Sequence, residues 1–197
     1  MRNTAKFVSA FAFAALTVAS HAVQLVANGN FDDASSTAWT DSGGIVGDWT
    51  PGVFGPGANN YAWLAGYGNA VDDLTQSVNF GAVAGTATLT FDLQIYVQDT
   101  FNRDFLTVKI GSTVLEAIDL GGSLDGYTGL IAKSYDVSSF MGTGTQVLAF
   151  EGRSDFRFNS SGFVDNVSIQ ATPVPEPATM TALALGLAAI ARRRKSA

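Results

Sequence analysis

A strict alternation of apolar and polar side chains runs from Thr86 to Gln98. The apolar positions are Ala87, Leu89, Phe91, Leu93, Ile95 and Val97, and the intervening positions are Thr88, Thr90, Asp92, Gln94, Tyr96 and Gln98. A period of two over this length is typical of a strand with one buried face, and no helical period fits it. The segment therefore predicts a β-sheet that packs on one side against a core.

Further strands are predicted on both sides of this segment. Gly111-Ser112 is a two-residue hairpin signal between an apolar face at 106–110 and a returning strand at 114–120. More strands are expected at 74–80, 133–137, 146–151 and 163–170, with turn residues between them. The predicted fold class is all-β, an antiparallel β-sandwich of the jelly-roll type. A signal helix is expected before it and a transmembrane helix after it.

The first 22 residues have the composition of a secretory signal peptide. Arg2 and Lys6 give a positive start, residues 7–19 are almost wholly apolar, and Ser20-His21-Ala22 places small residues where signal peptidase reads them. An N-terminal membrane anchor is the alternative, but the apolar run is short for a span of about 20 residues. We therefore expect signal peptidase to remove residues 1–22.

Residues 173–197 form a second segment of distinct composition. It contains Val174, Pro175, Glu176 and Pro177, then an apolar run over 178–191, and then Arg192, Arg193, Arg194 and Lys195. A basic cluster directly after an apolar helix is a stop-transfer signal that stays on the cytoplasmic side. An amphipathic surface helix is the alternative, but the apolar run has no polar face. The pattern predicts an anchor in the inner membrane.

This order of motif, apolar helix and arginine cluster resembles the PEP-CTERM sorting signal of Gram-negative bacterial surface proteins. The resemblance implies transient processing near Pro175–Pro177 by exosortase, a membrane-embedded cysteine protease-transpeptidase. It further implies an exported protein that passes from a membrane-anchored intermediate to the cell surface or extracellular matrix. The domain between the two end segments is then residues 23–172.

The composition of residues 23–172 excludes several kinds of chemistry. The chain has no cysteine, and its one histidine is His21. Thiolate and histidine catalysis, disulfides and the usual zinc sites are therefore excluded for this domain. It contains five basic and sixteen acidic residues, a net charge of about −11, against −6 for the whole chain. This sign disfavours nucleic acid as a partner and favours cations.

Two motifs at the ends of the domain carry a second resemblance. The domain opens with Asn28-Gly29-Asn30-Phe31-Asp32 and closes with residues 163–169, Phe-Val-Asp-Asn-Val-Ser-Ile. With Trp49 in a Gly-Asp-Trp context, this frame is similar to galactose-binding-like jelly rolls, above all to the carbohydrate-binding modules of extracellular glycanases. The resemblance implies a module that binds extracellular polysaccharide, with Trp49 in its core.

Asp165 is a candidate calcium ligand. Its position in phase with Phe163, Val167 and Ile169 predicts that it points toward the apolar side, where a carboxylate needs a hydrogen bond, a cation or a metal. A β-bulge that leaves Asp165 in water, or a hydrogen bond to a backbone amide, is the alternative. In the jelly rolls that the domain resembles, a structural Ca²⁺ often links the first and last strands, and Asp32 matches the first-strand position, where many relatives have Glu.

Aromatic residues are the candidate sugar contacts. Trp39, Trp63 and Tyr67 lie in a stretch rich in Gly and Asn, and flat rings of this kind stack on pyranose faces. The alternative is that these rings belong to the core. The loops 98–104 and 153–157 lie between predicted strands, where ligands are often bound, although ordinary solvated hairpin ends are the favoured interpretation.

We expect no enzymatic activity. Paired carboxylates would be the remaining route, and the domain has only Glu116 and Glu151 as glutamates, both on predicted strands without a catalytic motif. Two functions stay open at this point. One is a non-enzymatic polysaccharide-binding module, and the other is a structural, self-associating matrix protein without glycan affinity, in which an exposed sheet edge mediates assembly.

Overall fold

The structure is a computed structural model that describes residues 21–33, 35–47, 60–100, 103–123, 125–174 and 186. Most of the predicted signal peptide, Trp49, Pro175–Pro177 and Arg192–Arg194 lie outside these residues. The described strands are β1 (Val23–Gln24), β2 (Thr40–Asp41), β3 (Val46–Gly47), β4 (Tyr61–Leu64), β5 (Val71–Asn79), β6 (Gly85–Val97), β7 (Phe105–Ile110), β8 (Thr113–Asp119), β9 (Gly126–Tyr127), β10 (Ile131–Asp136), β11 (Thr145–Arg153) and β12 (Ser161–Pro173). A short 3-10 helix, η1 (Ser138–Phe140), precedes β11.

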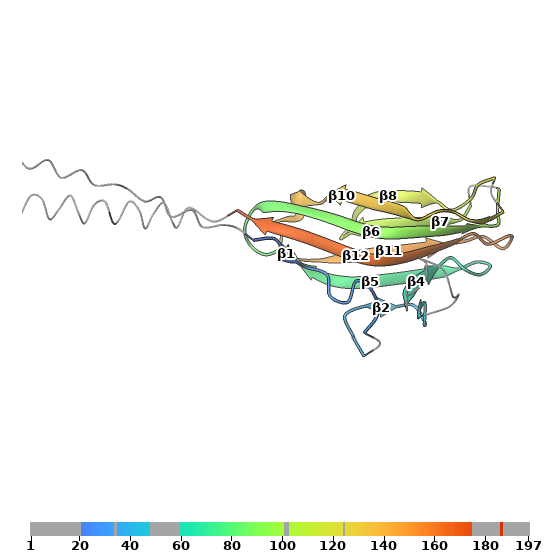
Figure 1. The fold of residues 1–197 in the computed structure, drawn as a ribbon, viewed down its shortest axis with the longest axis horizontal. Coiled ribbons are helices and arrows are strands. Elements are labelled where there is room, and N and C mark those ends of the chain that lie inside the picture. The colour runs from blue at the N-terminus through green and yellow to red at the C-terminus, as the bar shows by residue number, and fades with distance from the viewer. Residues whose placement is uncertain are drawn as a thin grey trace, which may run out of the picture.

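Two antiparallel sheets pack face to face (Figure 1). The first has the strand order β10-β6-β12-β4-β3, with β1 beside β12 and β9 beside β6, and the second has the order β2-β5-β11-β7-β8. The chain alternates between the sheets from β5 to β7 and again from β10 to β12, whereas β7 and β8 form a hairpin within the second sheet. The all-β sandwich predicted from the alternating pattern is therefore confirmed. Within the described part of the chain, no helix has the length and apolar composition of a membrane span.

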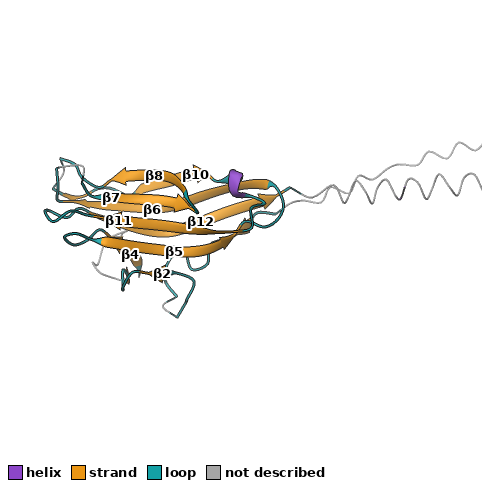
Figure 2. Ribbon diagram, turned by 180° about the vertical axis from the view of Figure 1, so that it is seen from behind, coloured by secondary structure: helices purple, strands orange, loops and turns teal. Residues whose placement is uncertain are grey.

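The molecule has two distinct ends. The start of β1 and the end of β12 lie together at one end, and η1 lies near it (Figures 1 and 2). We call this end the tail pole. The β4–β5, β6–β7 and β11–β12 loops gather at the opposite end, which we call the loop pole. The two longest strands, β6 and β12, pair with each other along most of the distance between the poles.

A chain of aromatic rings crosses the core between the sheets. Phe91 of β6 meets Phe150 of β11 edge to face, with ring centroids 5.1 Å apart. Phe150 contacts Trp39 at 6.3 Å, and Trp39 contacts Phe31 at 5.4 Å. On the other side, Phe91 stacks on Tyr135 of β10 at 5.9 Å. Because offset and edge-to-face pairs of this kind add to the gain from burial, these rings hold the two sheets together.

Two polar contacts of Glu116 link the outermost strands of the two sheets. Glu116 of β8 pairs with Lys133 of β10 at 2.7 Å between Oε2 and Nζ. The same carboxylate accepts a hydrogen bond from the hydroxyl of Tyr135. Burial, together with the charge of Glu116, raises the pKa of Tyr135, so the phenol stays protonated and donates at all ordinary pH values. The open edge of the sandwich is thus bridged between β8 and β10.

A β-bulge in β12 separates two faces of that strand. The register against β6 shifts between Asp165 and Ser168, and Asn166 has φ 52°. Before the bulge, Phe163 packs with Tyr61 on the outer face of the sheet; after it, Val167 and Ile169 enter the core. The prediction that Asp165 shares a face with Val167 and Ile169 was wrong, because the bulge reverses the alternation between them.

The opening segment of the domain closes over this bulge. The backbone N–H of Val167 donates to the carbonyl oxygen of Gly29 at 2.8 Å. A side chain at position 29 would place its Cβ 1.8 Å from the carbonyl oxygen of Val167. Only glycine therefore lets the first segment lie this close to the last strand.

Replacing Gly29 with alanine should lower the free energy of unfolding by about 1–3 kcal/mol, because the new methyl group forces the two backbones apart. Chemical denaturation of the Gly29→Ala variant measures this loss. Gly129→Ala is the matched control, since nothing lies within 4 Å of its Cβ position. Equal stability of the two variants would contradict the close approach.

Candidate functional site

Hydrogen bonds join the loops of the loop pole into one unit. The backbone N–H of Asn69 donates to the carbonyl oxygen of Asp155 at 2.6 Å, and that of Ala70 donates to Ser154 Oγ at 2.9 Å. Ser154 Oγ in turn donates to the carbonyl oxygen of Tyr67 at 2.5 Å. The β4–β5 and β11–β12 loops are thus fixed to each other.

The buried carboxylate of Asp104 accepts hydrogen bonds from the backbone of the β11–β12 loop. Asp104, which is fully buried, accepts hydrogen bonds from the backbone N–H groups of Asp155 at 3.1 Å and Ser160 at 2.6 Å. Ser160 Oγ accepts from the backbone N–H of Gln98 at 3.1 Å and of Asp99 at 3.0 Å. Burial raises the pKa of Asp104, and the two backbone hydrogen bonds partly offset this rise. Both ends of the loop are therefore anchored in the fold.

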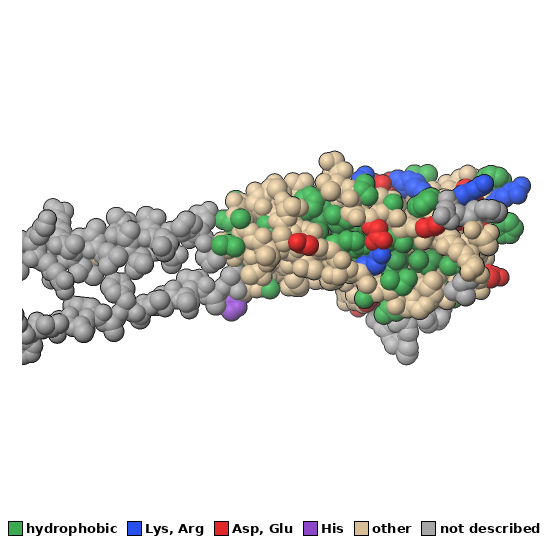
Figure 3. Space-filling model, turned by 90° about the horizontal axis from the view of Figure 1, so that it is seen from above, with side chains coloured by type: hydrophobic (Ala, Val, Ile, Leu, Met, Phe, Trp, Pro, Cys, Tyr) green, Lys and Arg blue, Asp and Glu red, His purple; other side chains and the backbone are tan. Residues whose placement is uncertain are grey.

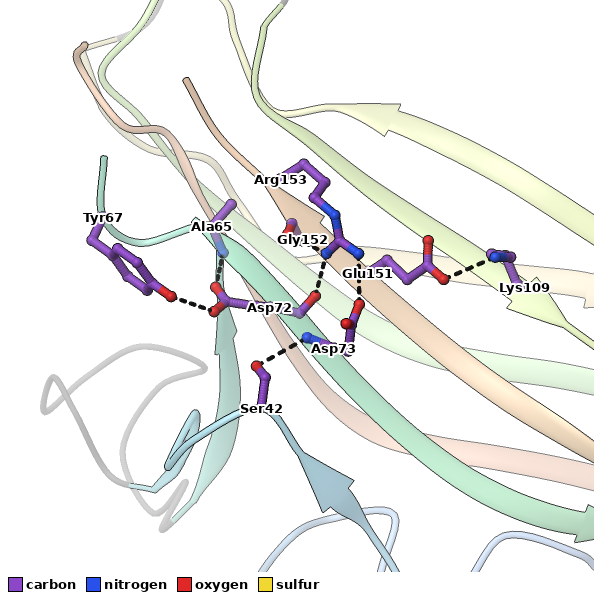
Figure 4. A network of polar contacts seen from close by, with 9 residues as sticks. All are labelled: Ser42, Ala65, Tyr67, Asp72, Asp73, Lys109, Glu151, Gly152 and Arg153. Carbon is purple, nitrogen blue, oxygen red and sulfur yellow. Dashed lines mark hydrogen bonds and ion pairs between the residues drawn. The ribbon is translucent and has the colours of Figure 1, made fainter. Parts of the chain in front are cut away.

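Asp72 positions the ring of Tyr67. Its side chain is buried, accepts from the backbone N–H of Ala65 at 2.8 Å and accepts from the Tyr67 hydroxyl at 3.1 Å (Figure 4). The negative charge of Asp72 raises the pKa of Tyr67. Arg153 reinforces the same strand end, because it donates to the carbonyl oxygen of Asp72 and to Asp73 Oδ1, both at 2.7 Å (Figure 4). The hydroxyl of Tyr67 is thus held while its ring faces solvent.

Three aromatic rings are exposed on these fixed loops. Tyr67 is 55% exposed, Phe156 63% and Phe158 69%. The guanidinium of Arg157 lies over the Phe156 ring at 5.1 Å from its centroid, and Arg103 pairs with Asp155 at 3.1 Å. Large apolar groups exposed on rigid loops mark interaction sites more often than packing positions. Flat rings beside carboxylate and guanidinium groups can stack on a sugar ring and hydrogen-bond its hydroxyls.

The structure separates the three predicted sugar contacts. Tyr67 belongs to the exposed group at the loop pole. Trp39 packs on Phe31 and Phe150, and its Nε1 donates to the carbonyl oxygen of Asn28 at 3.0 Å. Trp63 stacks on Phe163 at 6.3 Å on the outer face of β4 and β12. These two rings are only partly exposed, so their role as sugar contacts stays a prediction.

Trp39 also lines a pocket of about 250 Å³. Asn28, Asp33, Ser36, Asp41 and Asn60 contribute polar groups to its wall. Several of these groups already bind the backbone of their own turns: Asp41 Oδ1 accepts from Gly43 and Gly44, and Asp33 Oδ1 accepts from Ser35. The volume lies just below the range of about 300–1,000 Å³ typical of small-molecule sites, which suits one sugar ring.

Phe156 and Phe158 are not among the predicted sugar contacts. The pattern at 153–157 favours an ordinary solvated hairpin end. The available signal was the pattern Phe156-Arg157-Phe158 between Asp155 and Asn159, because two phenylalanines in a polar loop have no core to enter.

Asp165 lies in a strongly acidic surrounding. It is only 6% exposed, and its Oδ1 accepts from the backbone N–H of Asn166 at 2.7 Å. Asp92 accepts from Asn166 Nδ2 at 2.9 Å, and Asp32, which is exposed, accepts from Asn30 Nδ2 at 2.8 Å. Burial, with the charges of Asp32 and Asp92, raises the pKa of Asp165 to about 6. Among the described residues, no group of three or more acidic or histidine side chains is arranged to enclose a metal ion.

Comparison with known proteins identifies the C-terminal segment first. Residues 173–195 match the description "PEP-CTERM protein-sorting motif". The tail is a PEP-CTERM sorting motif. Such a motif implies export, processing by exosortase and a membrane-anchored intermediate on the way to the surface. The PEP-CTERM motif predicted for the tail is thereby confirmed. No curated protein matches the sequence.

Solved structures resemble the domain between the end segments. TmCBM61, a carbohydrate-binding module solved in complex with β-1,4-galactotriose, matches with a TM-score of 0.51 and 16% identity over 75% of this chain and 97% of its own. The arabinose-bound α-L-arabinofuranosidase MgGH51 matches with a TM-score of 0.50 and 15% identity over 77% of this chain and 27% of its own. At these identities the similarity establishes only the β-sandwich fold that this domain shares with them.

The pKa of Asp165 predicts a pH effect on stability. The pKa of Asp165 is about 6 in the folded protein and 3.8 in the unfolded chain. The folded state therefore holds this proton more tightly than the unfolded chain, and protonation of Asp165 favours folding. Its ionisation should therefore remove up to about 3 kcal/mol of stability as the pH rises from about 4 to 6 in the presence of a chelator. Asp165→Asn should abolish this step and be the more stable protein at pH 7.

Urea denaturation across this pH range measures the free energy of unfolding of the wild type and of Asp165→Asn. The difference between the two values isolates Asp165, because the other titrating groups are common to both proteins. Asp125→Asn, at an exposed position, is the control and should titrate like the wild type. A parallel pH dependence of wild type and Asp165→Asn would contradict the raised pKa.

Proposed function

We propose that residues 23–172 form a non-enzymatic module that binds extracellular polysaccharide through the loop pole. The observation that carries this proposal is the group of exposed rings, Tyr67, Phe156 and Phe158, on loops fixed by hydrogen bonds to the buried side chains of Asp104 and Asp72. Fixed loops favour binding because little conformational entropy is lost when the ligand docks. Sorting to the surface would present these rings to matrix glycans, and the fold is one that carbohydrate-binding modules use.

Calcium is the second part of the proposal. Asp165 is a buried carboxylate with acidic neighbours. None of the four ion pairs among the described residues involves Asp165. A cation held by Asp165 and Asp32 would remove the cost of this arrangement, and Ca²⁺ accepts carboxylate and carbonyl oxygens in flexible geometry. Because the described residues do not enclose an ion, backbone carbonyls and water would complete the coordination. The ion would tie the opening segment to β12.

Removing single rings should weaken retention on a polysaccharide. Phe156→Ala, Phe158→Ala and Tyr67→Ala should each lower the affinity about fivefold or more, the loss expected for an interface residue worth over 1 kcal/mol. Pull-down of residues 23–174 on a panel of immobilised and insoluble polysaccharides measures this. Val114→Ala, an exposed apolar position on β8, is the control and should bind like the wild type.

If only Trp39→Ala abolished binding, the sugar site would be the pocket that Trp39 lines. If only Trp63→Ala abolished it, the site would be the outer sheet face on which Trp63 stacks on Phe163. A folded protein that binds no glycan and assembles as its concentration rises in sedimentation experiments would instead support a structural matrix role.

Calcium should raise the melting temperature of the wild-type protein above its value in a chelator. The increase should grow from pH 5 to pH 7, because Asp165 must lose its proton to bind the ion. Asp165→Asn should show no increase, whereas Asp125→Asn should respond as the wild type does. An equal response of both variants would contradict a site at Asp165.

A further inference from the structure

The sorting motif begins inside the last strand of the domain. The PEP-CTERM match starts at Pro173, and β12 still pairs with β6 at this residue, where Pro173 lies opposite Gly85. The backbone N–H of Val174 donates to the carbonyl oxygen of Ala84 at 2.8 Å. The first two residues of the motif are therefore bound to the first sheet, at the tail pole.

The two strands lie unusually close at the start of the motif. A side chain at position 85 would place its Cβ 2.5 Å from the carbonyl oxygen of Thr172 and 2.9 Å from Cα of Pro173. Gly85 therefore allows β12 to stay in the sheet up to the motif. Because proline has no N–H to donate, the hydrogen bond of Val174 holds the motif beyond Pro173.

The partner of Val174 lies in a loop that is itself fixed. In this β5–β6 loop, the N–H of Phe80 donates to the carbonyl oxygen of Gly144, and the N–H of Gly144 donates to the carbonyl oxygen of Gly81, both at 2.9 Å. The buried ring of Phe80 also packs on Phe140, with ring centroids 5.7 Å apart. The β5–β6 loop is thus attached to the segment after η1, so the pair opens by movement of the β12 end.

Ion pairs do not reinforce this strand end. The four ion pairs among the described residues join other parts of the domain. In the view of Figure 3, the basic side chains lie over the middle of the domain and the loop pole, away from the tail pole. The end of β12 is held by backbone contacts, and strand ends held in this way open locally without unfolding of the whole domain.

Little chain separates the sheet from the apolar run of the tail. Only Pro175–Pro177 lie between Val174 and Ala178, where the apolar run begins. Three extended residues span at most about 10 Å. A protease that cuts near Pro175–Pro177 therefore works within this distance of the sheet, and the residues just before the cut belong to β12.

We propose that the end of β12 is an autoinhibitory contact, which withholds the start of the sorting motif from exosortase until the last pairs between β12 and β6 open. The proposal rests on the exosortase processing that the motif implies, and not on glycan binding. Cleavage of a transiently opened segment follows the population of its open form when opening and closing are fast. The pairing of Pro173 and Val174 therefore sets how fast the tail is removed.

An insertion that moves the motif out of the sheet tests this proposal. Gly-Ser-Gly-Ser between Thr172 and Pro173 leaves residues 173–195 intact but separates them from β6. In cells that make exosortase, we expect the tail to be removed about fivefold faster than from the wild type, the factor that corresponds to about 1 kcal/mol for one lost hydrogen bond. Pulse-chase labelling measures the rate. The same insertion after Gly129, at an exposed position between β9 and β10, should leave it unchanged.

A disulfide that locks the same pair tests the proposal in the opposite direction. The chain has no cysteine, and Cα atoms of a hydrogen-bonded antiparallel pair lie about 5.5 Å apart, a separation that a disulfide can bridge. The oxidised double variant Ala84→Cys/Val174→Cys should lose its tail about fivefold or more slowly than the same protein after reduction. Wild type with and without reductant controls for the cysteine of exosortase, and Val174→Cys alone controls for the changed motif.

Equal processing rates of the oxidised and reduced double variant would overturn the proposal, even if the insertion lowered the stability of the domain. An insertion after Thr172 that is processed no faster than the wild type, in a domain that melts like the wild type, would overturn it as well. A wild-type chain that keeps its tail in these cells would remove the processing on which the proposal rests.

Discussion

The ladder between β6 and β12 is the constraint on which the rest of the structure depends. These two thirteen-residue strands pair along the length of the first sheet and reach from the loop pole to the tail pole. Their inner faces supply Leu89, Phe91, Leu93 and Ile169 to the core. Their loop-pole ends place Ser160 and Gln98 in contact. Any loss of register here would move the exposed loops and the tail exit together.

Electrostatics in this domain follow from a shortage of basic residues. Four ion pairs among the described residues engage Arg103, Lys109, Lys133 and Arg153. One of them closes the sandwich edge, and another supports the strand end below Tyr67. Buried acids such as Asp72 and Asp104 therefore rely on hydrogen bonds from backbone N–H groups. Burial raises the pKa of Asp165 to about 6, because its one such bond offsets the burial only partly and the charges of Asp32 and Asp92 add to the rise.

The sequence predicted the strands well because their signal is local. The alternation at 86–98 matches β6, and the predicted strand at 163–170 lies within β12. The bulge at Asn166 was only an alternative in the sequence analysis, because Phe163, Asp165, Val167 and Ile169 keep an even spacing through it and do not reveal it. What fixes it is the approach of Gly29, which is far away in the sequence. The exposure of Phe156 and Phe158 is non-local in the same way, since it depends on how the neighbouring loops are anchored.

The position of β12 has a consequence for the order of events during export. β12 is the last strand of the domain to be synthesised, yet it lies in the middle of its sheet, between β6 on one side and β1 and β4 on the other. A chain that crosses a membrane from its N-terminus cannot complete this sheet until the residues next to the sorting tail have crossed as well. The first sheet therefore lacks its central strand until the residues next to the sorting tail are available, whereas the second sheet does not contain β12.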